Sequence, residues 1–257
     1  MVLGVTFWFL LSSALSVAEP TNDLAASRKA VVYSSCKIPN TAALTFDDGP
    51  YKFMTNISDL LVSKGAKGTF FVNGDNYACI YDTKVAARLQ YAYSNGHQIC
   101  SHTWSHPDLQ TLSENEIAGE IAQVDIALMK ILGVASPFIR PPFGSYNTLV
   151  RQVAFQQNKS LVLWDTDSED SLNATVAQSE GIYDDAISAN LSTILALNHE
   201  TEQTTAQELI GYAVDALQAA NYSLVTVAEC LGLEPYSFVG QLGQRDTTWF
   251  CPEDDDS

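Results

Sequence analysis

Short apolar runs alternate with longer amphipathic stretches along most of the chain. The runs are continuous rather than alternating with polar residues, which is typical of strands buried on both faces of a parallel sheet. They predict strands over 42–46, 68–72, 97–101, 137–140, 161–164, 193–198 and 223–227. The stretches between them predict helices near 53–64, 82–94, 113–132, 146–157, 178–190 and 204–219.

The helix over 113–132 has the clearest signals. Ser113 and Glu116 have the spacing of a capping box at its start, and Gly133 is placed to end it. Apolar residues recur between these points at steps of three and four, as on the buried face of a helix. Strands and helices that alternate in this way predict one α/β domain, either a barrel or a doubly wound sheet.

Polar side chains follow the carboxyl ends of most predicted strands. In a parallel barrel these ends share one face, and that face carries the active site. His97 begins its strand at the opposite end, so we expect a structural role for it. The polar residues are Asp47 and Asp48 after the first strand, His102 and His106 after the third, Arg140 after the fourth, Asp165, Asp167 and Asp170 after the fifth, and His199 after the sixth.

Two histidines and one carboxylate in this set have the character of metal ligands. His102 and His106 can bind one metal together, and zinc accepts imidazole and carboxylate ligands. Asp47 and Asp48 cannot point the same way from an extended strand, so one can bind a metal while the other transfers protons. The same ligand types also bind iron(II) in oxygenases, which stays an alternative.

The remaining two candidates are an arginine and a histidine. Arg140 could hold a carboxylate in a fixed position, or form an ordinary surface ion pair. His199 suits a general acid or base, a ligand, or a buried structural histidine.

Composition excludes several other functions. The chain has 257 residues, of which 46% are hydrophobic and 17% charged, as in a globular protein. A formal charge of −17 argues against sequence-independent nucleic-acid binding and against docking on anionic lipid. The sequence contains no G-x-S-x-G motif, so it does not support the nucleophile elbow of an α/β-hydrolase. It contains no G-x-G-x-x-G or P-loop motif, so it does not support a nucleotide cofactor. It also lacks the H-E-x-x-H motif of zinc proteases.

The first residues have the pattern of a secretory signal peptide. Residues 2–17 are apolar or small, and Ser16-Val17-Ala18 resembles a cleavage site. We therefore expect a signal peptide over 1–18, a catalytic domain over 19–250 and an acidic tail over 251–257, with a transmembrane anchor as the alternative for the first segment. The expected location is outside the cell or in the cell wall, with no membrane contact after cleavage.

Cysteines and glycosylation sequons also suit secretion. The cysteines lack zinc-knuckle spacing, so disulfides are expected. Cys36 with Cys230 is the favoured pair and Cys79 with Cys251 the second, which leaves Cys100 as a buried thiol. Five sequons predict N-glycosylation at Asn56, Asn158, Asn173, Asn190 and Asn221.

The polar motifs resemble, in order, the five motifs of the polysaccharide deacetylases of carbohydrate esterase family 4, the NodB-homology domain, and are most similar to those of fungal chitin deacetylases. The resemblance covers about 36–232. It implies a distorted (β/α) barrel of about seven parallel strands in a single domain. The motifs are Thr45-Phe46-Asp47-Asp48-Gly49-Pro50, His102-Thr103-Trp104-Ser105-His106, Arg140-Pro141-Pro142-Phe143-Gly144, Asp167-Ser168-Glu169-Asp170 and Leu195-Ala196-Leu197-Asn198-His199.

The resemblance also implies a role for each matched residue. Asp48, His102 and His106 would bind Zn²⁺, with Co²⁺ or another divalent cation as the alternative. Asp47 would be the general base, oriented by Arg140, and His199 the general acid, held by Asp170. The substrate-binding residues would be Phe143 through its main-chain N–H, Gly144 beside it, and Leu197 at the acetyl methyl group.

One position departs from the family pattern. The fourth motif normally ends in a tryptophan that forms a wall of the cleft, and Ser171 stands there. Trp104, Tyr146 and Trp164 are the candidates to replace that wall.

The implied function is a monomeric hydrolase that removes N-acetyl groups from chitin or chito-oligosaccharides. Acetylxylan or peptidoglycan as the substrate, and a secreted glycan-binding protein without catalysis, are the alternatives.

Overall fold

The computed structural model of the protein describes Met1 and residues 28–251. Residues 2–18 of the predicted signal peptide and 252–257 of the predicted acidic tail lie outside the described residues. Within the described residues, none of the helices combines the length and the apolar character needed to cross a bilayer.

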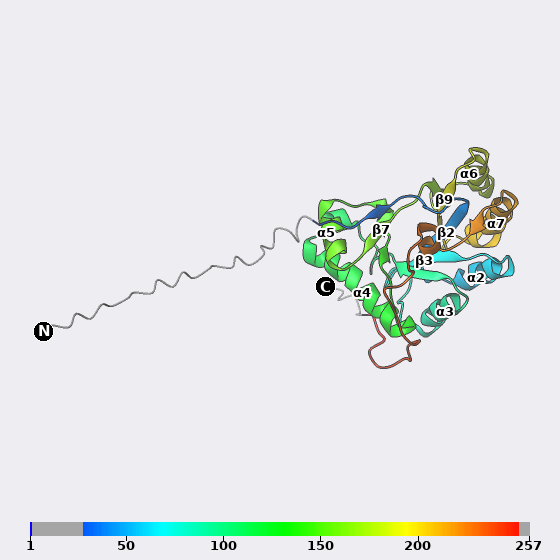
Figure 1. Cartoon of the computed structure of the whole chain (residues 1–257). Helices are drawn as coiled ribbons and strands as arrows, with labels where there is room; N and C mark the ends of the chain where they lie inside the picture. The colour runs from blue at the N-terminus through cyan, green and yellow to red at the C-terminus, as the bar shows by residue number, and fades with distance from the viewer. Residues whose placement is uncertain (2–27, 252–257) are drawn as a thin grey trace.

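Nine of the strands in the described residues lie in one curled parallel sheet that forms an open barrel (Figure 1). Its two end strands do not pair with each other among the described residues, so the barrel is distorted and incomplete. The fold therefore confirms the expected distorted (β/α) barrel in one domain. The strand order is β1 (Val32–Tyr33), β7 (Ser160–Val162), β6 (Phe138–Ile139), β4 (Gln98–Ser101), β3 (Gly68–Val72), β2 (Thr41–Gly49), β9 (Thr193–His199) and β8 (Thr166–Asp167), with β10 (Ser223–Leu224) also paired to β2.

Helices cover the outside of the sheet, and each one packs against the next (Figure 1). All six predicted helices are present, with ends shifted by a few residues. At the start of α4, Glu116 accepts hydrogen bonds from the main-chain N–H and the hydroxyl of Ser113, as the capping box predicts. In spatial order the helices are α5 (Thr148–Gln156), α4 (Glu114–Leu132), α3 (Thr83–Ser94), α2 (Met54–Ser63), α7 (Ile210–Ala219) and α6 (Val176–Ser188), with the π-helix η3 (Thr205–Leu209) leading into α7.

The central strands are buried on both faces, which explains their continuous apolar sequence. On β2, Leu44 and Phe46 face the helices in the larger hydrophobic cluster. Ala43 faces the barrel interior in a second cluster, together with Phe71 and Leu195. Because strand residues alternate between faces, Thr45 and Asp47 belong to the interior side as well.

A short helix, α8 (Val227–Leu231), contributes to the interior cluster and supplies Cys230, which is disulfide-bonded to Cys36. It also explains why the predicted strand 223–227 is wrong at its end. Thr226 caps α8 by accepting a hydrogen bond from the main-chain N–H of Glu229, so the strand stops at Leu224.

A second disulfide joins Cys79 to Cys251 and holds the last described residues against the loop between β3 and α3. Cys100 is a buried free thiol on β4, and burial raises its pKa to about 12. The segment before Cys251 contains β11 (Phe238–Val239), which pairs antiparallel with β5 (Val134–Ala135).

The other sequence-based expectations concern His97 and the sequons. His97 is buried at the amino end of β4, where its Nδ1 accepts a hydrogen bond from the main-chain N–H of Gly68 at 3.1 Å, and Ser58 lies at 3.1 Å from Nε2. This contact fits a structural role. All five sequon asparagines are exposed, so their side chains are accessible, and their glycosylation stays a prediction.

Candidate active site

The carboxyl end of β2 presents two neighbouring aspartates to the same space. Strand geometry alone would point Asp47 and Asp48 in opposite directions. The register between β2 and β3 shifts between Phe46 and Gly49, and Asp48 has a φ of 70°. This bulge turns the second carboxylate toward the barrel opening beside the first.

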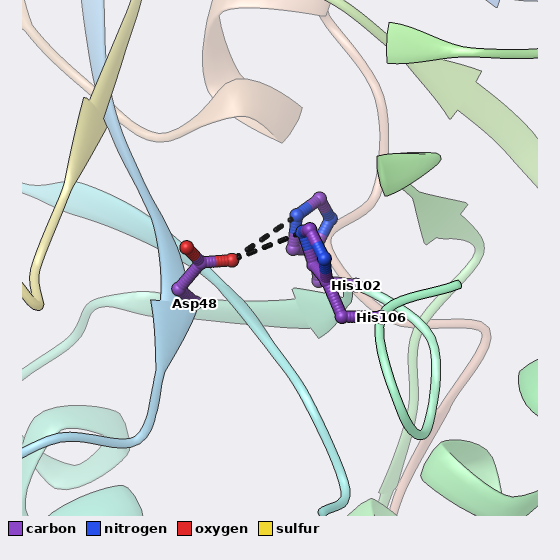
Figure 2. A group of neighbouring side chains, drawn as sticks. All are labelled: Asp48, His102 and His106. Atoms are coloured by element: carbon purple, nitrogen blue, oxygen red, sulfur yellow. Dashed lines mark ion pairs between the residues drawn. The ribbon is translucent and has the colours of Figure 1, made fainter. Parts of the chain in front are cut away.

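Asp48, His102 and His106 could together hold a metal ion, because their three ligand atoms lie within 4.8 Å of one another. Asp48 Oδ1 is 3.2 Å from His106 Nε2 and 3.6 Å from His102 Nε2 (Figure 2). Both histidines come from the loop after β4 and Asp48 comes from the end of β2, so two segments of chain converge at the metal-ligating group, as the strand-end argument predicts.

The surroundings of these three residues fit a cation. Asp48 Oδ1 is buried and has no hydrogen-bond partner among the described residues. Burying a carboxylate oxygen in this way costs free energy unless a positive group, such as a metal ion, lies beside it. The Nδ1 atom of His102 donates to the main-chain carbonyl of Arg140 at 2.8 Å, which leaves the Nε2 lone pair facing Asp48. Burial lowers the pKa of His102 to about 3, so the imidazole is neutral and able to coordinate.

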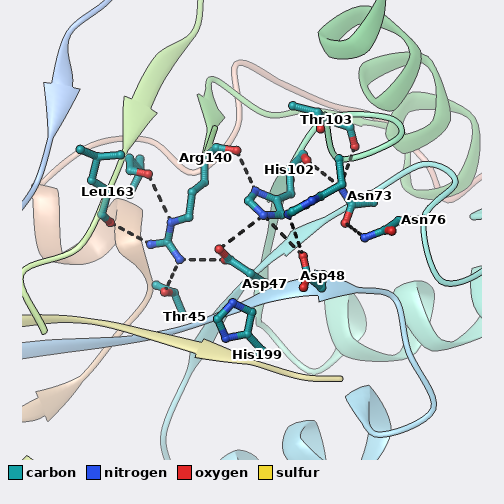
Figure 3. Close-up of polar contacts among 12 residues, drawn as sticks. Thr45, Asp47, Asp48, Asn73, Asn76, His102, Thr103, Arg140, Leu163 and His199 are labelled. Atoms are coloured by element: carbon teal, nitrogen blue, oxygen red, sulfur yellow. Dashed lines mark hydrogen bonds and ion pairs between the residues drawn. The ribbon is translucent and has the colours of Figure 1, made fainter. Parts of the chain in front are cut away.

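Arg140 fixes the other aspartate. It is fully buried, and its Nη1 atom donates to Asp47 Oδ1 at 2.8 Å and to Thr45 Oγ1 at 2.7 Å (Figure 3). Its other nitrogens donate to the main-chain carbonyls of Val162 and Leu163. The alternative of an ordinary surface ion pair is therefore excluded, and the guanidinium is a rigid support for one oxygen of Asp47.

The second oxygen, Asp47 Oδ2, faces the histidines, at 3.6 Å from His102 Nε2. Burial raises the pKa of the Asp47 carboxyl, while the charge of Arg140 opposes this rise. Arg140 thus holds one carboxylate oxygen of Asp47 in place, while the other oxygen points toward the metal-ligating histidines.

His199 lies at the end of β9 and is held by Asp170. Its Nδ1 and its main-chain N–H each donate to one oxygen of Asp170 at 2.7 Å, and Thr205 also donates to that carboxylate. Burial acts to lower the pKa of His199. The hydrogen bond to Asp170 and the negative charges of Asp170, Asp47 and Asp48 outweigh burial and raise this pKa to about 9. A protonated His199 at neutral pH is the consequence.

These groups line one cleft of about 440 Å³. Leu197 lies in its floor and is almost fully buried. Phe143 and Leu172 stand at its mouth with 70% and 66% of their surfaces exposed. The complete lining is Asp47, Asp48, His102, His106, Phe143, Trp164, Asp167, Ser171, Leu172, Leu197 and His199.

Three of the predicted substrate-binding residues are absent from this lining: Trp104, Tyr146 and Gly144. Trp104 packs over Gly74, leaving no room for a Cβ atom there, and borders a separate hollow beside Tyr81. Tyr146 is half-buried against the cluster around α5. Trp164 is the one candidate of the three that lines the cleft, and Gly144 permits its position, because a Cβ atom on Gly144 would come within 2.9 Å of its ring.

Four residues that sequence reasoning missed support the site. Thr45 binds Arg140, Thr205 binds Asp170, and Asn73 donates from its Nδ2 to the main-chain carbonyls of His102 and Thr103. Glu200 is fully buried and accepts a hydrogen bond from the main-chain N–H of Tyr51 at 2.7 Å. A usable signal existed for Thr45, which lies two residues before Asp47 on the same face of β2.

Several residues at the site have strained backbones. Asp48, Thr103, His106 and Phe143 all have positive φ values, between 60° and 72°, which non-glycine residues seldom adopt. Such conformations persist where surrounding contacts impose them, and they are common at functional sites.

Comparison with known proteins places this site in a family. Residues 34–161 match the family model described as polysaccharide deacetylase. A chitin deacetylase from Pestalotiopsis sp. is 33% identical over 90% of this chain and 77% of its own length. A probable peptidoglycan-N-acetylglucosamine deacetylase from Arthroderma benhamiae is 36% identical over 78% of this chain, which spans 46% of that longer protein.

The fold comparison agrees. The structure of the chitin deacetylase from Colletotrichum lindemuthianum matches with a TM-score of 0.78 and 29% identity, over 82% of this chain and 96% of that one. Sequence similarity across most of both chains and a shared fold lead to the same assignment: the protein belongs to the polysaccharide deacetylase family.

Proposed function

We propose that the protein is a secreted, zinc-dependent deacetylase that hydrolyses the N-acetyl groups of chitin or chito-oligosaccharides to acetate and free amine. The observation that carries the proposal is the cleft in which three metal-ligating side chains lie beside two held proton-transfer groups, Asp47 and His199. The names of the Pestalotiopsis and Colletotrichum relatives support the choice of chitin as the substrate.

Asp48, His102 and His106 would hold the cation. Two neutral imidazoles and one carboxylate suit zinc. When bound there, zinc would polarise the acetyl carbonyl and make a water molecule more acidic.

Asp47 would accept the proton of the attacking water on Oδ2, because Oδ1 is occupied by Arg140. The main-chain N–H of Phe143 would donate to the developing oxyanion, and Leu197 would contact the acetyl methyl group.

His199 would complete the reaction by protonating the sugar nitrogen as the C–N bond breaks, since an amide nitrogen leaves poorly as an anion. Its Nδ1 atom is bonded to Asp170, so the proton would leave from Nε2. The raised pKa of His199 keeps that proton in place at neutral pH.

Mass spectrometry of chito-oligosaccharides incubated with zinc-loaded and chelated protein tests the proposal. We expect the oligomer to lose the mass of C2H2O per event, because a hydrogen replaces each acetyl group, and we expect this loss to stop on chelation and resume when zinc is restored. Acetylxylan and peptidoglycan fragments, run in parallel, test the other substrates. Oligomer binding by the zinc-loaded protein without any acetate release would instead favour a glycan-binding protein.

Zinc activity under anaerobic conditions tests the oxygenase alternative, because an iron(II) oxygenase needs O₂ and a different metal. Detection of the protein in culture medium with the first residues removed would test secretion.

A further inference from the structure

Asn173 carries a predicted glycosylation site directly beside the active-site cleft. Of the five sequon asparagines, all of which the structure describes, it alone lies in a loop that lines the cleft. Ser171 and Leu172, the two residues before it, belong to the lining, and Asp170 accepts the hydrogen bond from His199 Nδ1 at 2.7 Å. Asn173 itself is exposed, so a sugar attached to its side chain would stand at the rim of the cleft.

Three of the other sequons lie at the opposite end of the sheet. Asn158, Asn190 and Asn221 each follow a helix and precede a strand, in the connections from α5 to β7, α6 to β9 and α7 to β10. In a parallel barrel such helix-to-strand connections lie at the amino ends of the strands, away from the face with the active site. Asn56 lies on the first turn of α2 and is not part of the cleft lining. Only a glycan on Asn173 would therefore border the cleft.

Hydrogen bonds hold the loop on both sides of this attachment point. Before it, the main-chain N–H of Leu172 donates to the carbonyl of Glu169 at 2.9 Å and closes a turn. After it, Thr175 caps α6 by accepting a hydrogen bond from the main-chain N–H of Gln178 at 3.3 Å. Asn173 has a φ of 65°, a conformation that asparagine tolerates better than most residues. A glycan on Asn173 would therefore start from a fixed position.

This position is close to the proton-transfer groups. Asn173 is three residues after Asp170, and three residues of extended chain span at most about 11 Å. Ser171 contributes only a small hydroxymethyl group to this edge of the cleft, and Leu172 exposes 66% of its surface. Because N-linked glycans are bulky, one on Asn173 would add far more bulk to this edge than either side chain does.

We propose that an N-glycan on Asn173 borders the substrate cleft and hinders the binding of long chito-oligosaccharides, so that the protein acts preferentially on short ones. A long oligomer would have to displace the glycan or restrict its motion, which costs conformational entropy. A short oligomer that occupies only the centre of the cleft would not meet the glycan. The inference rests on the proposed function, which supplies both the sugar-chain ligand and the secretory route on which glycans are attached.

The test compares wild type with Asn173→Asp, both secreted from the same glycosylating eukaryotic host and loaded with zinc. Aspartate cannot accept a glycan but also tolerates a positive φ. We expect kcat/KM for acetate release from chitohexaose to rise about fivefold in the variant, and that for chitotriose to stay within about twofold. Asn158→Asp is the matched control, because it makes the same charge change at a φ of 57° but removes a glycan from the opposite end of the sheet.

Calorimetric binding of the same two oligomers separates this inference from the reaction. Tighter binding of chitohexaose by Asn173→Asp than by wild type, in a protein that releases no acetate, would support the role of the glycan while the proposed function fails. Enzymatic removal of the glycans from folded wild type should reproduce the effect of Asn173→Asp, which excludes misfolding of the variant as its cause.

Three results would overturn the inference. The first is an unglycosylated Asn173 in the secreted wild type, as measured by mass spectrometry of the peptide that contains it. The second is an unchanged preference between the two oligomers, in both activity and binding, after the Asn173 glycan is lost. The third is an equal gain in Asn158→Asp, because the position of the glycan beside the cleft would then not be responsible.

Discussion

Asp47 and Asp48 are adjacent in the chain but differ in their contacts. One oxygen of Asp47 is bound by Arg140, whereas Asp48 Oδ1 has no hydrogen-bond partner among the described residues and faces two imidazoles. A bound arginine suits a residue that must keep one orientation during proton transfer, and an unpartnered oxygen suits a ligand. The two roles can therefore be separated by substitution.

Asp47→Asn should lower kcat by about 10²- to 10⁴-fold, the usual contribution of a general base, without loss of metal. Acetate release and elemental analysis on the same sample measure the two effects. Asp59→Asn, which changes an exposed aspartate bonded to Tyr91, is the control. Loss of metal in Asp47→Asn would reverse the assignment of the two aspartates.

Asp170→Asn should change the pH dependence of kcat/KM. His199 has a pKa of about 9, above its ordinary 6.5, so activity that needs its proton is present below that value and is lost as pH rises through it. Asp170 provides the strongest raising contact, so the alkaline limb should move to lower pH in the variant. Asp184→Asn, at the surface partner of Tyr212, should leave the limb in place. An unmoved limb in Asp170→Asn would argue against His199 as the acid.

At the scale of elements, the carboxyl ends of β2 and β9 are tightly packed against each other where Gly49 meets Glu200. Gly49 leaves room for the Glu200 carboxylate, because a Cβ atom on Gly49 would lie 1.5 Å from Glu200 Oε1. That oxygen also accepts the hydrogen bond from the main-chain N–H of Tyr51. The side chain of Glu200 therefore links the strand that ends in His199 to the loop that follows Asp48.

Gly49→Ala should lower the free energy of unfolding by about 1–3 kcal/mol, the usual cost of overpacking a buried site. Glu200→Ala removes the obstacle, so the double variant should be more stable than the sum of the two single changes predicts. Urea denaturation of the four proteins measures this coupling. Strict additivity would show that Glu200 moves away without cost.

The sequence predicts elements and site residues unequally, and local geometry explains the difference. The long helices can be predicted from the sequence, because each has apolar residues that recur over several turns and α4 also has its capping box. Strands of two residues, such as β1 and β8, are too short to show any period. The direction of Trp104 could not be predicted, because Thr103 and His106 have positive φ values that break the alternation of side chains in that loop. The meeting of the five motifs at one site could be predicted from the parallel direction of the strands alone, because parallel strands all end on one face of the barrel.

At the scale of the whole molecule, the net charge affects oligosaccharide binding and the disulfides affect stability. A formal charge of −17 would attract the amine-bearing product and partly deacetylated oligomers. Raising the salt concentration should therefore weaken binding of partly deacetylated oligomers, measured by calorimetry, more than binding of fully acetylated ones. The neutral oligomers are the internal control, and flat salt dependence for both would contradict the prediction.

The Cys36–Cys230 disulfide joins residues 194 positions apart, so it strongly restricts the unfolded chain. Replacing both cysteines with alanine should lower the free energy of unfolding by about 3–5 kcal/mol, measured with urea. Cys100→Ala, which removes a buried sulfur without breaking a crosslink, is the control for lost packing. A double variant no less stable than this control would argue against a stabilising crosslink.

Cys100 also gives the native protein a built-in kinetic reporter. The other four cysteines are in disulfides, and this thiol lies at the centre of the sheet, on β4 directly before the loop that carries His102. A thiol reagent can react with it only when the sheet opens locally or globally. The rate of labelling would therefore measure how often the sheet around β4 opens beneath the active site. Comparing that rate with and without zinc or oligosaccharide would show whether either ligand reduces this opening. The experiment needs no added probe, because Cys100 is part of the native chain.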